Sequence, residues 1–224
     1  MNTLSKIISS NPSEKKKWLV ASLITIFIAA ICGLYVNFTG MNLMVFQAWS
    51  FISAAVASLL LALALSASSL SYYFGWPDMR WGYQKQIGVM AFWIMCFYCV
   101  SLLILYPETY WFGFRENIYT ADMMLGITAV FIFGAMVGIN SKIGSAYFSW
   151  ETIKFVLGLG YVGYALLVIR AVLIEWPLWE DWFSTFEGYP PGRLMLSVIA
   201  IGVLLMRVSI TIHKMTIKKE SLKS

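Results

Sequence analysis

The sequence predicts an all-α membrane protein: a bundle of six transmembrane helices with both termini on the cytoplasmic side. Its composition is that of a lipid-embedded chain, because 60% of the 224 residues are hydrophobic and 12% are charged. Soluble domains are about 45 to 50% apolar and about 25% charged. Six apolar segments each approach the roughly 20 residues that a helix needs to cross about 30 Å of hydrocarbon. Lysine and arginine fall in alternate connectors, which sets the orientation.

The six predicted spans form one transmembrane domain over residues 19–212. They lie near residues 19–36, 47–69, 87–106, 121–139, 156–174 and 194–212. Residues 1–18 and 213–224 are basic arms that we expect in the cytoplasm. The runs lack the short alternating pattern of membrane β-barrels, which favours helices over strands. The first apolar run is longer than a signal-peptide core, so we interpret it as a retained helix.

Basic residues identify the predicted cytoplasmic side, because Lys and Arg resist transfer across the bilayer. That side carries Lys6, Lys15, Lys16, Lys17, Arg80, Lys85, Lys142, Lys154, Lys214, Lys218, Lys219 and Lys223. The opposite side carries Arg115 and Arg193 together with Glu108, Glu116, Glu175, Glu180, Asp181 and Glu187. The net charge of +5 therefore indicates membrane topology and does not indicate nucleic-acid binding.

Aromatic residues cluster where the helices should meet the headgroups, which is typical of interfacial anchors. They are Trp76 and Trp81, the stretch 106–114, and Trp176, Trp179 and Trp182. We expect a connector from Glu175 to Arg193, whose tryptophan-rich first part, residues 176–182, would lie as an amphipathic segment along the membrane surface.

Three ionisable residues within the spans need an explanation, because charges in lipid are costly. Asp122 begins the fourth span and Arg170 lies about one turn from the same end of the fifth, so we predict a structural ion pair. A functional ion site is the alternative. Arg207 is deeper in the sixth span, and we expect its side chain to extend toward the cytoplasmic headgroups beside His213 and Lys214.

Glycines in the fourth and fifth spans predict close helix packing. Gly134 and Gly138 form a small-xxx-small pair, which favours packing inside the bundle over dimerisation. Gly158, Gly160 and Gly163 match a dinucleotide-binding fingerprint, but that motif follows a strand and opens a helix. Here it lies inside an apolar span, so we assign these glycines to helix packing.

Cys96 and Cys99 are three residues apart, so a helix places both thiols on one face. They are candidate redox thiols, although a membrane thiol oxidoreductase usually needs a second pair and Cys32 is the only other cysteine. Packing is the interpretation that we favour. His213 is the only histidine, and no further ligand converges on it for a metal or haem site. We predict no metal site and no catalytic residue.

The order of landmarks in the third to fifth spans resembles the ferric reductase-like transmembrane domain, the haem-bearing core of ferric reductases, NADPH oxidases and the haem subunit of bacterial methionine sulfoxide reductase. The matching residues are Lys85 to Phe92, Leu125 to Ala129, Asn140 and Ser141, Ile143 and Gly144, and Trp150. The resemblance covers about half the chain and implies six helices with both termini inside. In that family, histidines on the third and fifth helices hold haem. Here Tyr98 and Lys154 stand near such positions.

The missing histidines predict a haem-free protein on this scaffold that acts as a non-catalytic membrane subunit or assembly factor. The expected partners are the lipid bilayer and a membrane or redox protein. One alternative is a membrane oxidoreductase that uses haem b with atypical ligands, quinone, or the Cys96 and Cys99 thiols, with a separate electron donor. Another is a small-solute transporter. We place the chain by default in a bacterial inner membrane.

Overall fold

The structure is a computed structural model that describes residues 12–39, 44–74, 83–118, 120–141 and 144–221. Its helices are α2 (Pro12–Phe38), α3 (Val45–Phe74), α4 (Gln84–Leu105), the π-helical turn η1 (Glu108–Phe112), α5 (Phe114–Asn117), α6 (Ala121–Ile139), α7 (Gly144–Tyr147), α8 (Trp150–Thr185) and α9 (Gly192–Ser221). Several predicted features lie outside the described residues: Lys6, Trp76, Arg80, Trp81, Lys142 and Lys223.

Six of the helices, α2, α3, α4, α6, α8 and α9, are long and apolar enough to cross a membrane within the described residues. The predicted six-helix bundle is therefore confirmed, and all six predicted spans coincide with these helices. Most of the helices extend beyond the predicted limits, because the hydropathy pattern marks only the lipid-embedded part of a helix. The helix α6 begins and ends where the sequence predicts.

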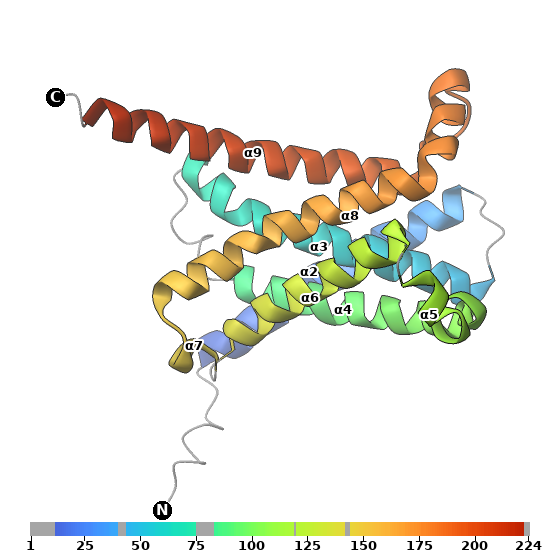
Figure 1. Ribbon diagram of the computed structural model, residues 1–224, viewed down its shortest axis with the longest axis horizontal. Coiled ribbons are helices and arrows are strands. Elements are labelled where there is room, and N and C mark those ends of the chain that lie inside the picture. The colour runs from blue at the N-terminus through green and yellow to red at the C-terminus, as the bar shows by residue number, and fades with distance from the viewer. Residues whose placement is uncertain (1–11, 40–43, 75–82, 119, 142–143, 222–224) are drawn as a thin grey trace, which may run out of the picture.

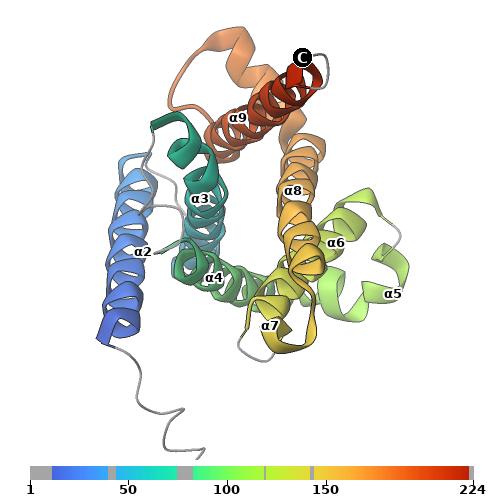
Figure 2. The same cartoon turned by 90° about the vertical axis from the view of Figure 1, so that its left-hand side faces the viewer.

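Five helices form a closed ring in the order α3, α4, α6, α8 and α9, with α9 packing back against α3. The end-on view in Figure 2 shows this ring, with α2 outside it against α3 and α4. The most buried of the six spans is α3, whose inward residues are mainly Ala, Ser and Leu. Small side chains let neighbouring helices approach closely, which explains the central place of α3.

Charged residues separate to the two ends of the bundle. One end holds the first turns of α2, α4 and α8 and the last turns of α3 and α9 (Figure 1). We call it the lysine-rich end after Lys15, Lys16, Lys17, Lys85, Lys154 and Lys214. The opposite end holds η1, α5 and the last turns of α8. We call it the acidic end after Glu108, Glu116, Glu175, Glu180, Asp181 and Glu187.

The fifth span was predicted to end near residue 174, before an amphipathic segment, but α8 continues as one helix to Thr185 with Pro177 inside it. Proline cannot donate a backbone hydrogen bond and its ring displaces the preceding turn, so it bends a helix. Figure 1 shows the last part of α8 turned across the bundle axis. The residue that follows the helix, Phe186, has a left-handed φ of 51°, which ends the helix at Thr185.

Candidate functional site

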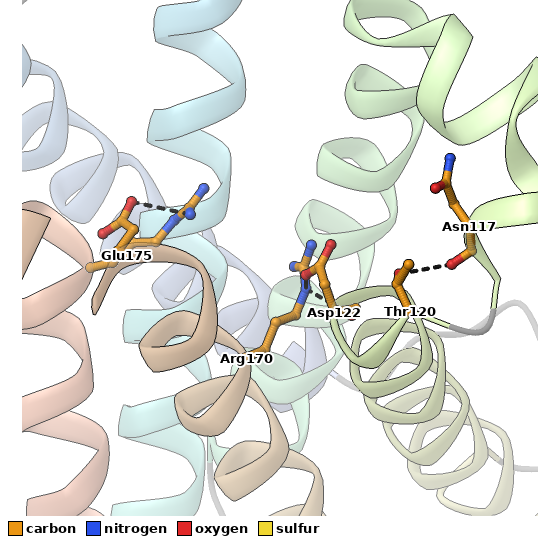
Figure 3. Close-up of polar contacts among 6 residues, drawn as sticks. Asn117, Thr120, Asp122, Arg170 and Glu175 are labelled. Carbon is orange, nitrogen blue, oxygen red and sulfur yellow. Dashed lines mark hydrogen bonds and ion pairs between the residues drawn. The ribbon is translucent and has the colours of Figure 1, made fainter. Parts of the chain in front are cut away.

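Arg170 and Asp122 meet at the acidic end, between α8 and α6. The Nε atom of Arg170 lies 2.6 Å from Oδ1 of Asp122, and it also approaches the Asp122 carbonyl oxygen at 3.3 Å (Figure 3). The Arg170 side chain is 16% exposed and that of Asp122 is 32% exposed. Gly126 makes room for this arrangement, because a Cβ atom there would lie 3.3 Å from Arg170 Nε. The structure thus brings together the two residues that the sequence paired.

A second ion pair lies near the first and was missed by the sequence analysis. Arg193 at the start of α9 places Nη1 3.1 Å from Oε1 of Glu175 on α8. Trp179 Nε1 donates to the other carboxylate oxygen at 3.3 Å, and the Trp179 side chain is buried. Each of the two arginines therefore faces a carboxylate, which lowers the cost of holding charge beside lipid.

Arg170 also lies on the wall of two cavities. The larger one, about 600 Å³, opens between α4 and α6 and is almost entirely apolar. Its polar wall residues are Tyr98, Cys99, Tyr110, Asp122 and Arg170. The smaller one, about 120 Å³, lies inside the ring between α3, α4, α8 and α9. Tyr98 also contributes to both walls. An apolar chamber with polar groups at one end suits an amphipathic molecule.

The connector after α4 covers the outer end of the larger cavity with Tyr110, Trp111 and Phe114. Burial raises the pKa of Tyr110, and the nearby Asp122 carboxylate raises it further against the opposing charge of Arg170. The Tyr110 phenol therefore keeps its proton at neutral pH. It can act as a hydrogen-bond donor toward the cavity.

Two tyrosines on successive turns of α8 cross the ring and bind α3. The Tyr164 hydroxyl donates to the Ser58 carbonyl oxygen at 3.1 Å, and the Tyr161 hydroxyl donates to the Leu65 carbonyl oxygen at 2.8 Å. Tyr164 is 1% exposed, so its side chain fills space at the centre of the bundle. We name Tyr161 and Tyr164 the tyrosine bridge. The only sequence signal for it is their three-residue spacing inside an apolar span, which alone does not name a partner.

Tyr98 and Lys154, the two positions suggested by the family resemblance, lie at different depths. Both helices start at the lysine-rich end, and Tyr98 follows the start of α4 by about 21 Å whereas Lys154 follows the start of α8 by about 6 Å. The Lys154 ammonium lies over the Trp150 ring at 5.2 Å from its centroid. These two side chains cannot ligate one iron atom between α4 and α8.

The cysteines are free thiols in the structure. Cys99 lies on the wall of the larger cavity, and Cys96 is one turn away on α4. Cys32 is buried in α2 against the core. Among the described residues, no group of three or more His, Cys, Asp and Glu side chains could hold a metal ion.

Three of the five predicted packing glycines face a neighbouring helix. Gly160 lies against Met136 and Gly163 lies against Ile132 and Phe133 of α6, while Gly134 faces Phe92 of α4. The prediction is wrong for Gly158 and Gly138, where an added Cβ would meet no atom within 4 Å. Gly158 is two residues from Gly160 and so lies on nearly the opposite face of α8. Gly138 is in the last turn of α6, beyond the contact with Phe92.

Arg207, whose side chain was expected to extend toward the headgroups, and His213, expected at the cytoplasmic end of the sixth span, both contact aromatic rings near the lysine-rich end. The Arg207 guanidinium lies over the Tyr161 ring at 4.9 Å from its centroid. The His213 Nδ1 atom forms a hydrogen bond with the Tyr72 hydroxyl.

No known protein family matches the chain. No curated protein matches it either.

Proposed function

We propose that the chain is a haem-free membrane protein on a ferric reductase-like scaffold, which acts as a non-catalytic subunit or assembly partner of another membrane protein. The observation that carries the proposal is the tyrosine bridge. In the haem-bearing members of that family, the cofactor lies between the third and fifth spans, and the third and fifth spans of this chain are α4 and α8. Here Tyr164 lies on the wall of the cavity inside the ring together with Tyr98 of α4, and both tyrosines of the bridge donate to α3.

The remaining space and the available ligands also support a haem-free interior. The cavity inside the ring is about 120 Å³, whereas sites for drug-sized ligands are about 300 to 1,000 Å³. The only histidine, His213, lies near the end of α9. Bis-imidazole ligation is therefore unavailable, and the residues of the ring do not fit the family's haem.

An absorption spectrum tests the haem-free part of the proposal. The chain is produced in haem-replete cells beside a haem-bearing member of the ferric reductase-like family, and both are purified in detergent. We expect a Soret band for the control and none above background for this chain. A stoichiometric Soret band would overturn the proposal. If that band also shifted in Tyr98→Phe, the haem-free proposal would give way to a haem site in which the Tyr98 oxygen ligates the iron.

The partner role predicts that the chain belongs to a larger assembly in its own membranes. We expect the tagged chain, extracted with a mild detergent, to migrate on a native gel well above the size of the purified chain with its micelle. Migration at the size of the purified chain would contradict the partner role. It would not bear on the haem-free part of the proposal.

We also propose that the lysine-rich end faces the cytoplasm of a bacterial inner membrane. Lysine and arginine in short connectors tend to stay on the cytoplasmic side during insertion. The acidic end, with its aromatic residues and the turned end of α8, then faces the outside. Both termini are cytoplasmic in this arrangement.

The larger cavity favours a second candidate function, the binding of an isoprenoid quinone in a membrane oxidoreductase. Its volume of about 600 Å³ lies within the range of ligand sites, and its wall is almost entirely apolar. A quinone ring accepts hydrogen bonds through its carbonyl oxygens, and Tyr98, Tyr110 and Arg170 supply donors at one end. Any electron donor would be a separate protein. The third hypothesis, a solute transporter, has less support because each described span is one continuous helix.

A short-chain quinone tests this second candidate in detergent-purified protein. We expect saturable binding that becomes about two- to tenfold weaker in Tyr110→Phe, because one hydrogen bond is lost. Tyr83→Phe at the lysine-rich end is the matched control and should bind as the wild type does. Absence of saturable binding, or equal losses in both variants, would exclude the quinone site.

The thiol version of the oxidoreductase hypothesis is tested separately. If the Cys96 and Cys99 thiols carry the redox chemistry, any quinone-linked activity disappears in Cys99→Ala. Unchanged activity in that variant would eliminate the thiols and leave quinone binding unaffected.

A further inference from the structure

Arg207 is a cation within a membrane span whose described partner is an aromatic face. It follows the start of α9 by about 22 Å, which places it toward the lysine-rich end of a hydrocarbon layer about 30 Å thick. Its guanidinium lies over Tyr161, whose hydroxyl is bonded to α3. The stacking orients the Arg207 side chain, because the bonded ring cannot easily move away.

Arg207 lacks a counter-charge in the part of the chain that the structure describes. Both ion pairs there belong to Arg170 and Arg193 at the acidic end. The described carboxylates of the lysine-rich end, Glu14 and Glu151, are in the first turns of α2 and α8. A cation–π contact uses the face of the guanidinium, so its in-plane N–H groups remain able to donate.

A second cation shares this side of α9. Lys214 is seven residues from Arg207, which places both on one helix face. The Lys214 ammonium lies over the Tyr72 ring at 5.6 Å from its centroid, beside the hydrogen bond between Tyr72 and His213. Tyr73 donates to Ser209 at 2.9 Å, which also fixes this part of α9 against the end of α3. Both views show α8 and α9 diverging toward this end (Figures 1 and 2).

We propose that Arg207 and Lys214 bind the phosphate group of an anionic phospholipid at the lysine-rich end of α9. With 30 residues, α9 is about 45 Å long and exceeds the hydrocarbon layer. Lys214 therefore reaches the headgroup layer, and Arg207 lies on the same helix face about two turns deeper, with its guanidinium held over Tyr161. The in-plane guanidinium donors match phosphate oxygens, and the ammonium adds a second positive charge. The anionic headgroup supplies the counter-charge that the described chain does not.

Native mass spectrometry of the purified chain, titrated with phosphatidylglycerol or phosphatidylcholine, tests this site. We expect the wild type to bind phosphatidylglycerol more tightly than phosphatidylcholine. Arg207→Gln and Lys214→Gln should each weaken phosphatidylglycerol binding about fivefold, as expected for removal of one cation near an anionic headgroup. Arg207→Lys should fall between the wild type and Arg207→Gln, because it keeps the charge and loses the planar donors.

Lys85→Gln is the matched control, because it removes one exposed positive charge at the same end but from α4. We expect it to bind phosphatidylglycerol as the wild type does. An equal loss in Lys85→Gln would indicate diffuse surface charge and overturn the site. Equal binding of the two lipids by the wild type would also overturn it, as would unchanged binding in Lys214→Gln. The Lys214 variant keeps the test valid if Arg207→Gln does not fold.

Discussion

Asp122 on α6 and Arg170 on α8 form an ion pair, with Arg170 Nε 2.6 Å from Asp122 Oδ1. The pair joins two helices that also pack along their lengths. Asp122→Asn leaves the arginine without its counter-charge in a partly buried position. We expect a loss of about 1 to 3 kcal/mol in the free energy of unfolding, measured by thermal or denaturant unfolding in detergent.

Glu180→Gln at the same end is the control, because that side chain is exposed. Its effect should stay within about 0.5 kcal/mol. The double variant Asp122→Asn with Arg170→Gln should cost less than the sum of the single variants, since it leaves neither charge alone. Additive single effects would show that the two charges do not stabilise one another.

The tyrosine bridge should stabilise the ring in proportion to its hydrogen bonds and its volume. Tyr164→Phe removes the hydroxyl that donates to Ser58 and should lower the free energy of unfolding by about 0.5 to 1.5 kcal/mol. Tyr164→Ala also leaves a cavity, so its loss should be about 3 to 5 kcal/mol. Tyr189→Phe, at a 61% exposed position, should have little effect in the same melts. Equal melting of all three variants would refute the bridge.

The packing of α8 on α6 should depend on Gly163 and not on Gly158. A Cβ atom at Gly163 would lie 3.1 Å from Ile132 and 3.2 Å from Phe133, whereas one at Gly158 would meet nothing within 4 Å. We expect Gly163→Val to destabilise the bundle by about 1 to 3 kcal/mol through overpacking. Gly158→Val should melt near the wild type, and a larger effect there than at Gly163 would reverse the assignment of the faces.

Cysteine labelling tests the orientation. In a background without Cys32, Cys96 and Cys99, single cysteines replace Lys17, Lys214 and Glu180. We expect an impermeant thiol reagent added outside intact cells to modify the cysteine at 180 and to reach those at 17 and 214 only after the membrane is opened. Labelling of positions 17 and 214 from opposite sides would contradict the shared end.

The sequence predicted the spans well because burial in lipid is a property of whole segments. A run of about 20 apolar residues suffices to locate a membrane-spanning helix, and the positions of Lys and Arg indicate which of its ends faces the cytoplasm. The segment around Pro177 shows the limit of predicting helix ends from hydropathy. Proline and a rise in polarity after Glu175 predict a connector, yet near the membrane surface the backbone can continue as a bent helix to Thr185.

The site was less predictable because it depends on which faces meet. Asp122 and Arg170 could be paired from the sequence, since two rare charges fall at the same depth of neighbouring spans. The pairing of Glu175 with Arg193 requires the turn between α8 and α9, which the hydropathy pattern does not define. The partners of Tyr161 and Tyr164 are backbone carbonyl groups. Every residue has such a group, so the sequence does not identify which one a tyrosine contacts.

The closure of the ring has a consequence for assembly. The helix α9 packs against α3 and α8, so the ring closes only after α9 has been inserted. Until then the surfaces of α3 and α8 that α9 will cover remain accessible to lipid or to an insertion factor. The early pairs, such as α3 with α4 and α6 with α8, can form hairpin by hairpin as the chain emerges. Truncation before α9 would therefore remove the contacts of α9 with α3 and α8, and the tyrosine bridge would be left as the connection between α8 and α3.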